Sequence, residues 1–197
     1  MTKTNDVATK FRGPRSKVGI FIDGANLYAA SRGLGKEIDY RLLGDFFASK
    51  LDMDVRRSYY YSALLDTEEY SPLKPLTDWL SYNGYYLVTK QAREFTDGSG
   101  RRRVKGNMDI ELAVNMMEMA PHLDHVILFS GDSDFRSLLE AVQRQGVFVT
   151  VVSTIKVSPP MIADELRRQC DQFIDLDNII GNFQRNVDAA RHHENDE

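Results

Sequence analysis

The sequence contains one cysteine, Cys170, and no long run of apolar residues. A single cysteine excludes an internal disulfide framework and a cysteine-rich zinc site, and it favours a cytoplasmic location. The longest apolar stretches, such as 126–129 and 147–152, are far shorter than the ~18 residues that cross a bilayer. Residues 1–10 are polar and contain no apolar h-region, so we expect neither a secretory signal nor a membrane partner.

A general excess of positive charge is also lacking, because 25 Lys and Arg residues face 29 Asp and Glu residues, for a net charge of −4. Any attraction for phosphate must therefore be local. One basic segment is residues 1–17, and the other, at 90–105, contains Lys90, Arg93, Arg101, Arg102, Arg103 and Lys105. We expect residues 1–16 to form a flexible basic arm, 17–185 a single domain, and 186–197 a disordered acidic tail.

The predicted domain alternates between strand-like and helix-like segments. Apolar, β-branched and aromatic runs predict strands over 17–23, 55–63, 85–90, 125–130, 147–153 and 173–175. Apolar spacing and capping residues predict helices from near Asn26 and over 39–50, 71–84, 108–120, 133–145, 159–169 and 176–185. The polar, glycine-containing segment 95–106 predicts an exposed hairpin or loop. This alternation predicts an α/β fold with a mostly parallel sheet covered by helices on both faces.

Three acidic motifs fall where such a sheet carries function, at the carboxyl ends of strands. The first, Phe-Ile-Asp-Gly-Ala-Asn at 21–26, ends a strand at Asp23, turns at a glycine and places Asn26 to cap a helix. The second, Ser-Gly-Asp-Ser-Asp-Phe at 130–135, repeats this arrangement with Asp132 and Asp134. The third, Lys-Gly-Asn-Met-Asp-Ile-Glu at 105–111, places Asp109 in the first turn of a helix.

Each motif by itself is equally compatible with an ordinary helix cap. Together they indicate a site, because Asp23 and Asp132 emerge at the same edge of a parallel sheet. Clustered carboxylates raise one another's pKa unless a cation compensates their charge. Mg²⁺ and Mn²⁺ prefer oxygen ligands and can activate water for attack on phosphorus. Carboxylates without His or Cys therefore favour phosphoester chemistry over zinc proteolysis.

The motifs at 21–26, 105–112 and 129–135 resemble those of the NYN domains, within the PIN-like nuclease superfamily, and the LabA-like bacterial branch in particular. The resemblance extends over about residues 18–175. It implies a PIN-like three-layer α/β/α sandwich of Rossmann-like topology and metal-dependent endoribonuclease activity. It assigns catalysis and the binding of Mg²⁺ or Mn²⁺ to Asp23, Asp109, Asp132 and Asp134. Asn26 and Ser130 would position these groups or contact phosphate.

The basic segment next to Asp109 is a candidate contact for the RNA backbone. Its members are Lys90, Arg101, Arg102 and Arg103, with Lys105 as a further phosphate-binding residue. A solvated surface loop is an equally good interpretation of this segment. Two other functions stay open: a catalytically weak RNA-binding or regulatory module, and a small-molecule phosphoesterase, which predicts a closed pocket.

Aromatic and histidine residues give weaker signals. The tyrosines at 59–61 could stack on bases, but alternating strand tyrosines are usually half core and half surface, and we favour that interpretation. His122 and His125 flank a strand start and are expected at the surface or in turns. Exposed aromatic side chains permit a homodimer without requiring one.

Overall fold

The computed structural model describes residues 16–50, 53–65, 73–96, 102–105 and 107–185. Apart from residue 16, the predicted N-terminal arm and the predicted C-terminal tail lie outside these ranges.

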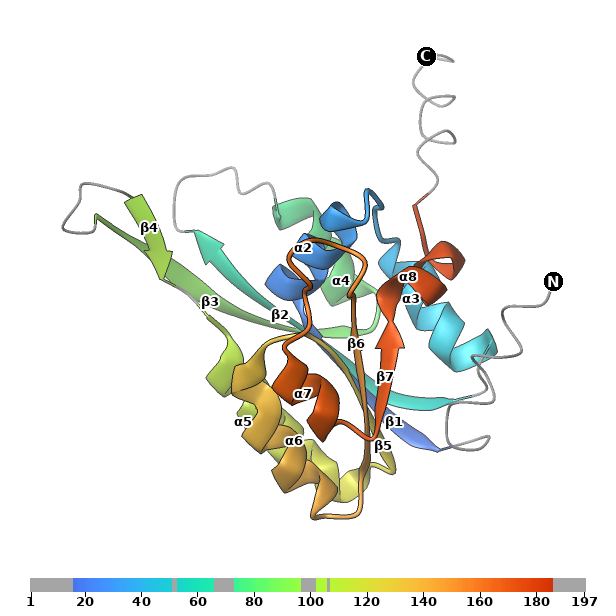
Figure 1. Cartoon of the computed structure of the whole chain (residues 1–197). Helices are drawn as coiled ribbons and strands as arrows, with labels where there is room; N and C mark the ends of the chain where they lie inside the picture. The colour runs from blue at the N-terminus through green and yellow to red at the C-terminus, as the bar shows by residue number, and fades with distance from the viewer. Residues whose placement is uncertain (1–15, 51–52, 66–72, 97–101, 106, 186–197) are drawn as a thin grey trace, which may run out of the picture.

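Within the described residues, seven strands form one sheet in the order β4-β3-β2-β1-β5-β6-β7 (Figure 1). The strands are β1 (Lys17–Asp23), β2 (Asp54–Leu65), β3 (Tyr85–Thr96), β4 (Arg102–Lys105), β5 (His125–Phe129), β6 (Phe148–Ser153) and β7 (Gln172–Asp175). All neighbouring strands pair in parallel except β3 and β4, which form an antiparallel hairpin. The chain builds outward from β1 to β4 and then from β5 to β7 on the other side. The strand order therefore reverses between β1 and β5, where open sheets of this kind form their binding crevice.

Helices cover both faces of the sheet, which confirms the predicted three-layer α/β/α fold (Figure 1). One face is covered by α2 (Gly24–Gly33), α3 (Tyr40–Asp45), α4 (Lys74–Tyr82) and α8 (Leu176–Ile179). The other face is covered by α5 (Asp109–Met119), α6 (Arg136–Gln143) and α7 (Asp164–Gln169). Each layer packs its own apolar cluster against the sheet, so the central strands are buried on both sides.

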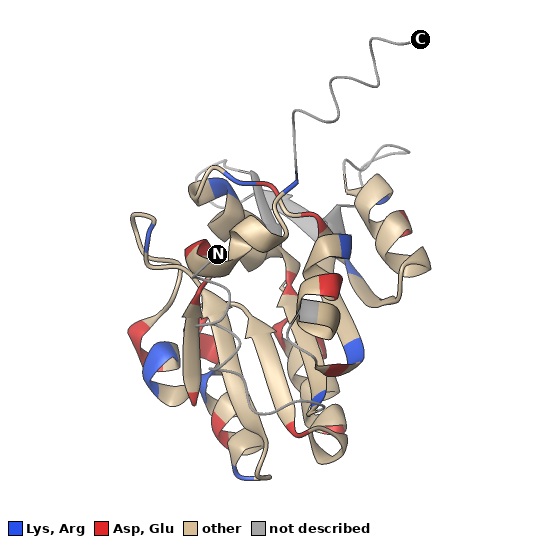
Figure 2. Cartoon of the chain, turned by 90° about the vertical axis from the view of Figure 1, so that its right-hand side faces the viewer, with Lys and Arg blue, Asp and Glu red and all other residues tan. Residues whose placement is uncertain are grey.

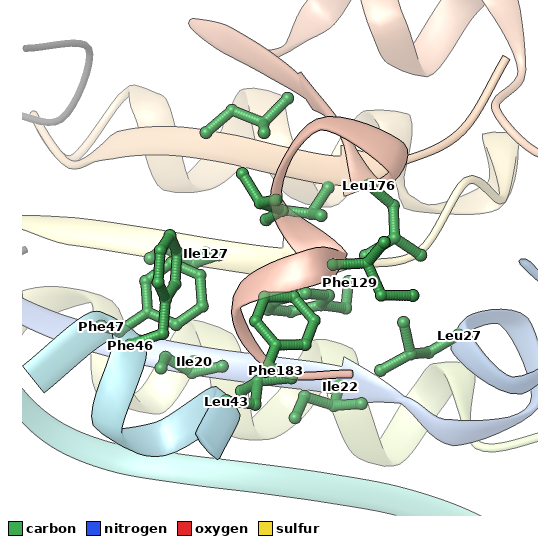
Figure 3. Packing of buried hydrophobic residues seen from close by; sticks show 14 of the residues in the cluster. Ile20, Ile22, Leu27, Leu43, Phe46, Phe47, Ile127, Phe129, Leu176 and Phe183 are labelled. Atoms are coloured by element: carbon green, nitrogen blue, oxygen red, sulfur yellow. The ribbon is translucent and has the colours of Figure 1, made fainter. Parts of the chain in front are cut away.

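The central strand β1 shows why the apolar runs in the sequence are continuous. Ile20 and Ile22 point into the cluster beneath α2, α3 and α8, whereas Phe21 points into the cluster beneath α5 and α6. Figure 3 shows Ile20 and Ile22 packed with Leu27 of α2 and Phe183. Because each buried side chain of this size contributes about 1.5–3 kcal/mol, both layers hold β1 firmly in place.

Two predicted helices are present but shorter than predicted. The helix expected over 159–169 begins only at Asp164, because the backbone N–H groups of Met161 and Ala163 donate to distant carbonyl oxygens, those of Thr154 and Gly131. The helix expected over 176–185 ends at Ile179 and continues as a 3₁₀ turn, Ile180–Asn182. The residues that follow leave the helical conformation, because Gln184 forms an antiparallel β-bridge with Ile38.

Other predicted elements keep their position and change in form. The helix expected over 39–50 becomes a π-helical turn at Phe46–Lys50, and the helix expected over 133–145 starts as the 3₁₀ turn Ser133–Phe135. Strand β3 extends to Thr96 and pairs with β4, so the described parts of the segment 95–106 form the two strands of the predicted hairpin.

The expectations for His125 and for the tyrosines at 59–61 are wrong. His125 is fully buried, with its Nε2 atom 2.8 Å from the Thr150 hydroxyl oxygen. Tyr59, Tyr60 and Tyr61 are all buried, because both faces of β2 are covered. Local sequence could not reveal these burials, since each depends on a neighbouring strand or layer.

Candidate metal-binding active site

Asp23 stands at the junction of β1 and α2, as predicted. It is the N-cap of α2, and its Oδ1 atom accepts a hydrogen bond of 3.1 Å from the Asn26 N–H. Its Oδ2 atom accepts a hydrogen bond of 3.0 Å from the Ser130 hydroxyl, which follows β5. Asp23 therefore connects the two strands between which the strand order reverses.

Asn26 connects the same two turns through its side chain. Its Oδ1 atom accepts a hydrogen bond of 3.1 Å from the Gly131 N–H. The expectation that Asn26 caps α2 is therefore wrong, because Asp23 occupies that position. Asn26 instead orients the turn that carries the second acidic motif. In that turn Asp132 accepts a hydrogen bond of 3.0 Å from the Asp134 N–H, and its own N–H donates to the Ser130 Oγ atom at 3.3 Å.

Both turns need glycine because another backbone segment passes close by. A Cβ atom on Gly24 would lie 2.7 Å from the Tyr61 carbonyl oxygen. A Cβ atom on Gly131 would lie 1.7 Å from the Met161 carbonyl oxygen. The φ angle is not positive at either glycine, so the requirement is steric clearance and not an unusual backbone conformation.

Three of the predicted carboxylates meet at one point. Asp109, Asp132 and Asp134 each offer an oxygen atom, and these atoms all lie within 4.8 Å of one another. Asp109 belongs to the first turn of α5, and Asn107 donates a hydrogen bond to its Oδ2 atom. Asp23 lines the same cleft, but it is not part of this three-residue group.

Burial and neighbouring negative charge disfavour the ionised forms of Asp109 and Asp23. The pKa of Asp109 is raised, first by burial and then by the negative charges of Asp132, Asp23 and Asp134. The pKa of Asp23 is also raised by burial, against the lowering effect of its hydrogen bonds from Asn26 and Ser130. A hard divalent cation would remove this mutual repulsion, and an all-oxygen ligand set suits Mg²⁺ or Mn²⁺. The residues present therefore fit the predicted metal.

The carboxylates line a cleft of about 970 Å³ beside the N-terminus of α2, at the carboxyl ends of the parallel strands, and we call this part the acidic end. One part of the remaining wall is aromatic and apolar, and includes Tyr28, Tyr40, Tyr60, Tyr61, Leu73 and Leu76. Another part is charged, with Arg32, Lys36, Glu37 and Arg185. Sequence reasoning missed this wall. The only signal for Tyr28 was its place on the helix that starts at Asp23.

The predicted RNA-contacting residues have a different outcome from the carboxylates. The Lys90 Nζ atom lies 2.9 Å from the Glu111 Oε1 atom, and this contact lowers the pKa of Glu111. Glu111 lies two residues after Asp109 in α5 and was not singled out as a site residue. Arg101 lies outside the described residues, as do the side chains of Arg102, Arg103 and Lys105, so their contacts with phosphate stay predictions.

The distribution of charge agrees with the sequence analysis. On the side seen in Figure 2, basic and acidic positions are interspersed and form no continuous basic face. None of the helices in the described ranges is both long and apolar enough to cross a membrane.

With this geometry established, comparisons with known proteins identify the family. The family model of the NYN domain matches residues 17–177. The chain belongs to the NYN domain family. This NYN domain is 35% identical over 166 residues to the low amplitude and bright protein LabA of Synechococcus elongatus. The matched region covers 83% of this chain and 86% of LabA. It is therefore of the LabA-like type.

A solved structure shares the fold. The crystal structure of a protein of unknown function from Vibrio parahaemolyticus matches this NYN domain with a TM-score of 0.68 and 23% identity, over 89% of this chain and 99% of that chain. Membership of the NYN family places the chain in a nuclease-like superfamily whose enzymes generally depend on divalent metals.

Proposed function

We propose that this NYN domain protein is an endoribonuclease that depends on Mg²⁺ or Mn²⁺. The observation that carries the proposal is the convergence of Asp109, Asp132 and Asp134 within 4.8 Å at the end of the cleft. When bound there, the metal would compensate negative charge and activate water for attack on phosphorus.

The chain's own residues divide the work of holding this site. Asp109, Asp132 and Asp134 would hold the ion, and Asp23 would complete the acidic end of the cleft. Ser130 keeps Asp23 oriented through its hydroxyl hydrogen bond. Asn26 holds the Gly131 backbone, so the spacing between the β1 and β5 turns stays constant. Metal sites rely on such supporting contacts as strongly as on the ligands themselves.

The size and lining of the cleft support a polymer substrate over a small phosphate ester. Its volume of about 970 Å³ and its aromatic wall exceed what a phosphate group alone would occupy. A regulatory RNA-binding module is less well supported, because a protein that only binds phosphates gains nothing from repelling them with four carboxylates. The expected cytoplasmic location and the homodimer stay predictions.

The test is cleavage of a fluorescent RNA by the full chain with Mn²⁺, with and without EDTA. We expect Mn²⁺-dependent cleavage that falls by about a hundredfold or more in Asp132→Asn and Asp23→Asn, with unchanged circular dichroism. Glu165→Gln is the matched control, because Glu165 is exposed on α7 and does not line the cleft. Full activity of both Asp variants, or activity in EDTA, would reject the assignment.

A further inference from the structure

The cleft continues from the carboxylates along the exposed face of α2. Tyr28 and Arg32 lie four residues apart on this helix, so they share one face, and both line the cleft. The Tyr28 side chain is 59% exposed. A large aromatic ring thus stands in solvent on a cleft wall, next to the acidic end, without a buried packing role.

Beyond Tyr28 the cleft wall becomes basic. Arg32, Lys36 and Arg185 line this end together with Glu37. The Arg185 N–H donates a hydrogen bond of 2.9 Å to the Glu37 carbonyl oxygen, which fixes the C-terminal segment beside the loop that follows α2.

The free charge at this end is positive. Lys36 is compensated by Asp177, whose Oδ1 atom lies 2.9 Å from the Lys36 Nζ atom. Arg32 and Arg185 form no ion pair with any side chain in the described part of the chain. The two guanidinium groups without an ion pair therefore outnumber the one carboxylate, Glu37, that lines this end of the cleft.

The spacing of the two ends suits a chain and not a single phosphate. Arg32 is nine residues from Asp23, or about 13.5 Å along the α2 axis at 1.5 Å per residue. A ligand that spans this distance must meet carboxylates and any metal at one end, an exposed ring in the middle and guanidinium groups at the other. A single-stranded nucleic acid presents matching groups in that order: a reacting phosphate, an unpaired base and a neighbouring phosphate.

We propose that α2 carries a substrate-binding subsite, in which Tyr28 stacks on a base next to the reacting phosphate and Arg32 and Arg185 bind a flanking phosphate. The subsite deepens, and rests on, the proposed nuclease function. It directs the strand along α2, whereas the sequence analysis placed the RNA contacts on the β3–β4 side. Lys90, which lies on that side, already pairs with Glu111.

The test measures, by fluorescence anisotropy, how tightly the full chain binds a labelled single-stranded RNA of about twelve nucleotides in EDTA. We expect Tyr28→Ala to weaken binding about tenfold and Tyr28→Phe to retain it, because stacking needs the ring and not the hydroxyl. Arg32→Ala should also weaken binding and should reduce the slope of log K against log salt by about 0.7, as for one lost phosphate contact on a single strand.

Two variants serve as matched controls. Tyr82 is 89% exposed and does not line the cleft, so Tyr82→Ala controls for the loss of a surface tyrosine. Arg144 is an exposed arginine on the far side of the sheet, so Arg144→Ala controls for lost charge. The subsite is overturned if the wild-type chain does not bind the RNA, if Tyr28→Ala and Arg32→Ala bind as tightly as wild type, or if the controls weaken binding equally.

A second measurement separates this proposal from the nuclease assignment. With Mn²⁺, Tyr28→Ala and Arg32→Ala should raise KM for the RNA, whereas Tyr82→Ala and Arg144→Ala, which lie outside the cleft, should leave KM and kcat unchanged. Cleavage with an unchanged KM would sustain the nuclease and overturn the subsite. If the two variants weaken RNA binding in EDTA but the wild-type chain cleaves no RNA with Mn²⁺, the subsite is supported and the nuclease assignment is rejected.

Discussion

Replacing Gly131 with alanine should test whether close backbone packing holds the acidic turn in place. The added Cβ atom would lie 1.7 Å from the Met161 carbonyl oxygen, 2.6 Å from the Met161 carbonyl carbon and 2.8 Å from the Ile162 Cα atom. All three are backbone atoms, so rotation of a side chain cannot relieve the clash. The turn after β5, or the segment before α7, must move.

The cost follows from two contributions. Forcing an extra methyl group into a packed site costs about 1–3 kcal/mol. The movement also strains two hydrogen bonds of Gly131, its carbonyl oxygen with the Ala163 N–H at 2.9 Å and its N–H with Asn26 at 3.1 Å, each contributing about 0.5–1.5 kcal/mol. We expect Gly131→Ala to lower the free energy of unfolding by about 2–6 kcal/mol, which corresponds to a fall in Tm of at least roughly 4 °C for a chain of this size.

Thermal unfolding followed by circular dichroism would measure this effect, with Gly181→Ala as the control. A Cβ atom on Gly181 meets nothing within 4 Å, and its φ is not positive, so its Tm should change little or rise slightly. Titration calorimetry with Mn²⁺ on the same variant should show weaker binding, because Asp132 follows Gly131 directly. A Tm for Gly131→Ala within about 2 °C of wild type would refute the packing argument.

Three further predictions concern the site and the sheet. Asn26→Ala should lower stability by about 1–3 kcal/mol in urea unfolding, because the Gly131 N–H loses its partner. Mn²⁺ affinity, measured by calorimetry, should rise with pH through the acidic range, because the pKa of Asp109 is raised and protons compete with the metal for this carboxylate. In the metal-free protein the same raised pKa means that the contribution of Asp109 to the free energy of unfolding falls as the pH rises. An affinity independent of pH between about 4 and 7 would contradict the proposed ligand set. Thr150→Val should cost about 1–3 kcal/mol, because His125 loses a buried hydrogen-bond partner, and Thr150→Ser should recover most of that loss in the same unfolding assay.

The parallel sheet and its acidic end could be predicted because their signals are local. A strand buried on both faces is apolar without interruption, as 18–22 is, and Asp23 and Asp132 each follow such a strand directly. Parallel pairing then brings both residues to one edge without further information. The sheet order is not written in any local pattern, but the alternation of strands and helices restricts it to a few arrangements.

The features that could not be predicted depend on residues distant in the chain. Lys90 pairs with Glu111, which is 21 residues away, and its partner cannot be chosen from the sequence around it. The turn at Gly131 packs against Met161, so its glycine looks like an ordinary flexible residue until the loop is seen. His125 resembles a turn histidine because its polar partner, Thr150, lies on the neighbouring strand.

The sheet also separates the chemistry from two tight reversals of the chain. Gly84 and Gly146 both have φ of +82°, are exposed, and precede β3 and β6 at the edge opposite the carboxylates. Strand β6 alone spans six residues, or about 20 Å, between that edge and the acidic end. A spectroscopic label or a fused reporter attached beside either reversal would therefore lie far from the cleft. These two turns are suitable attachment sites for labelling the protein without disturbing the carboxylates.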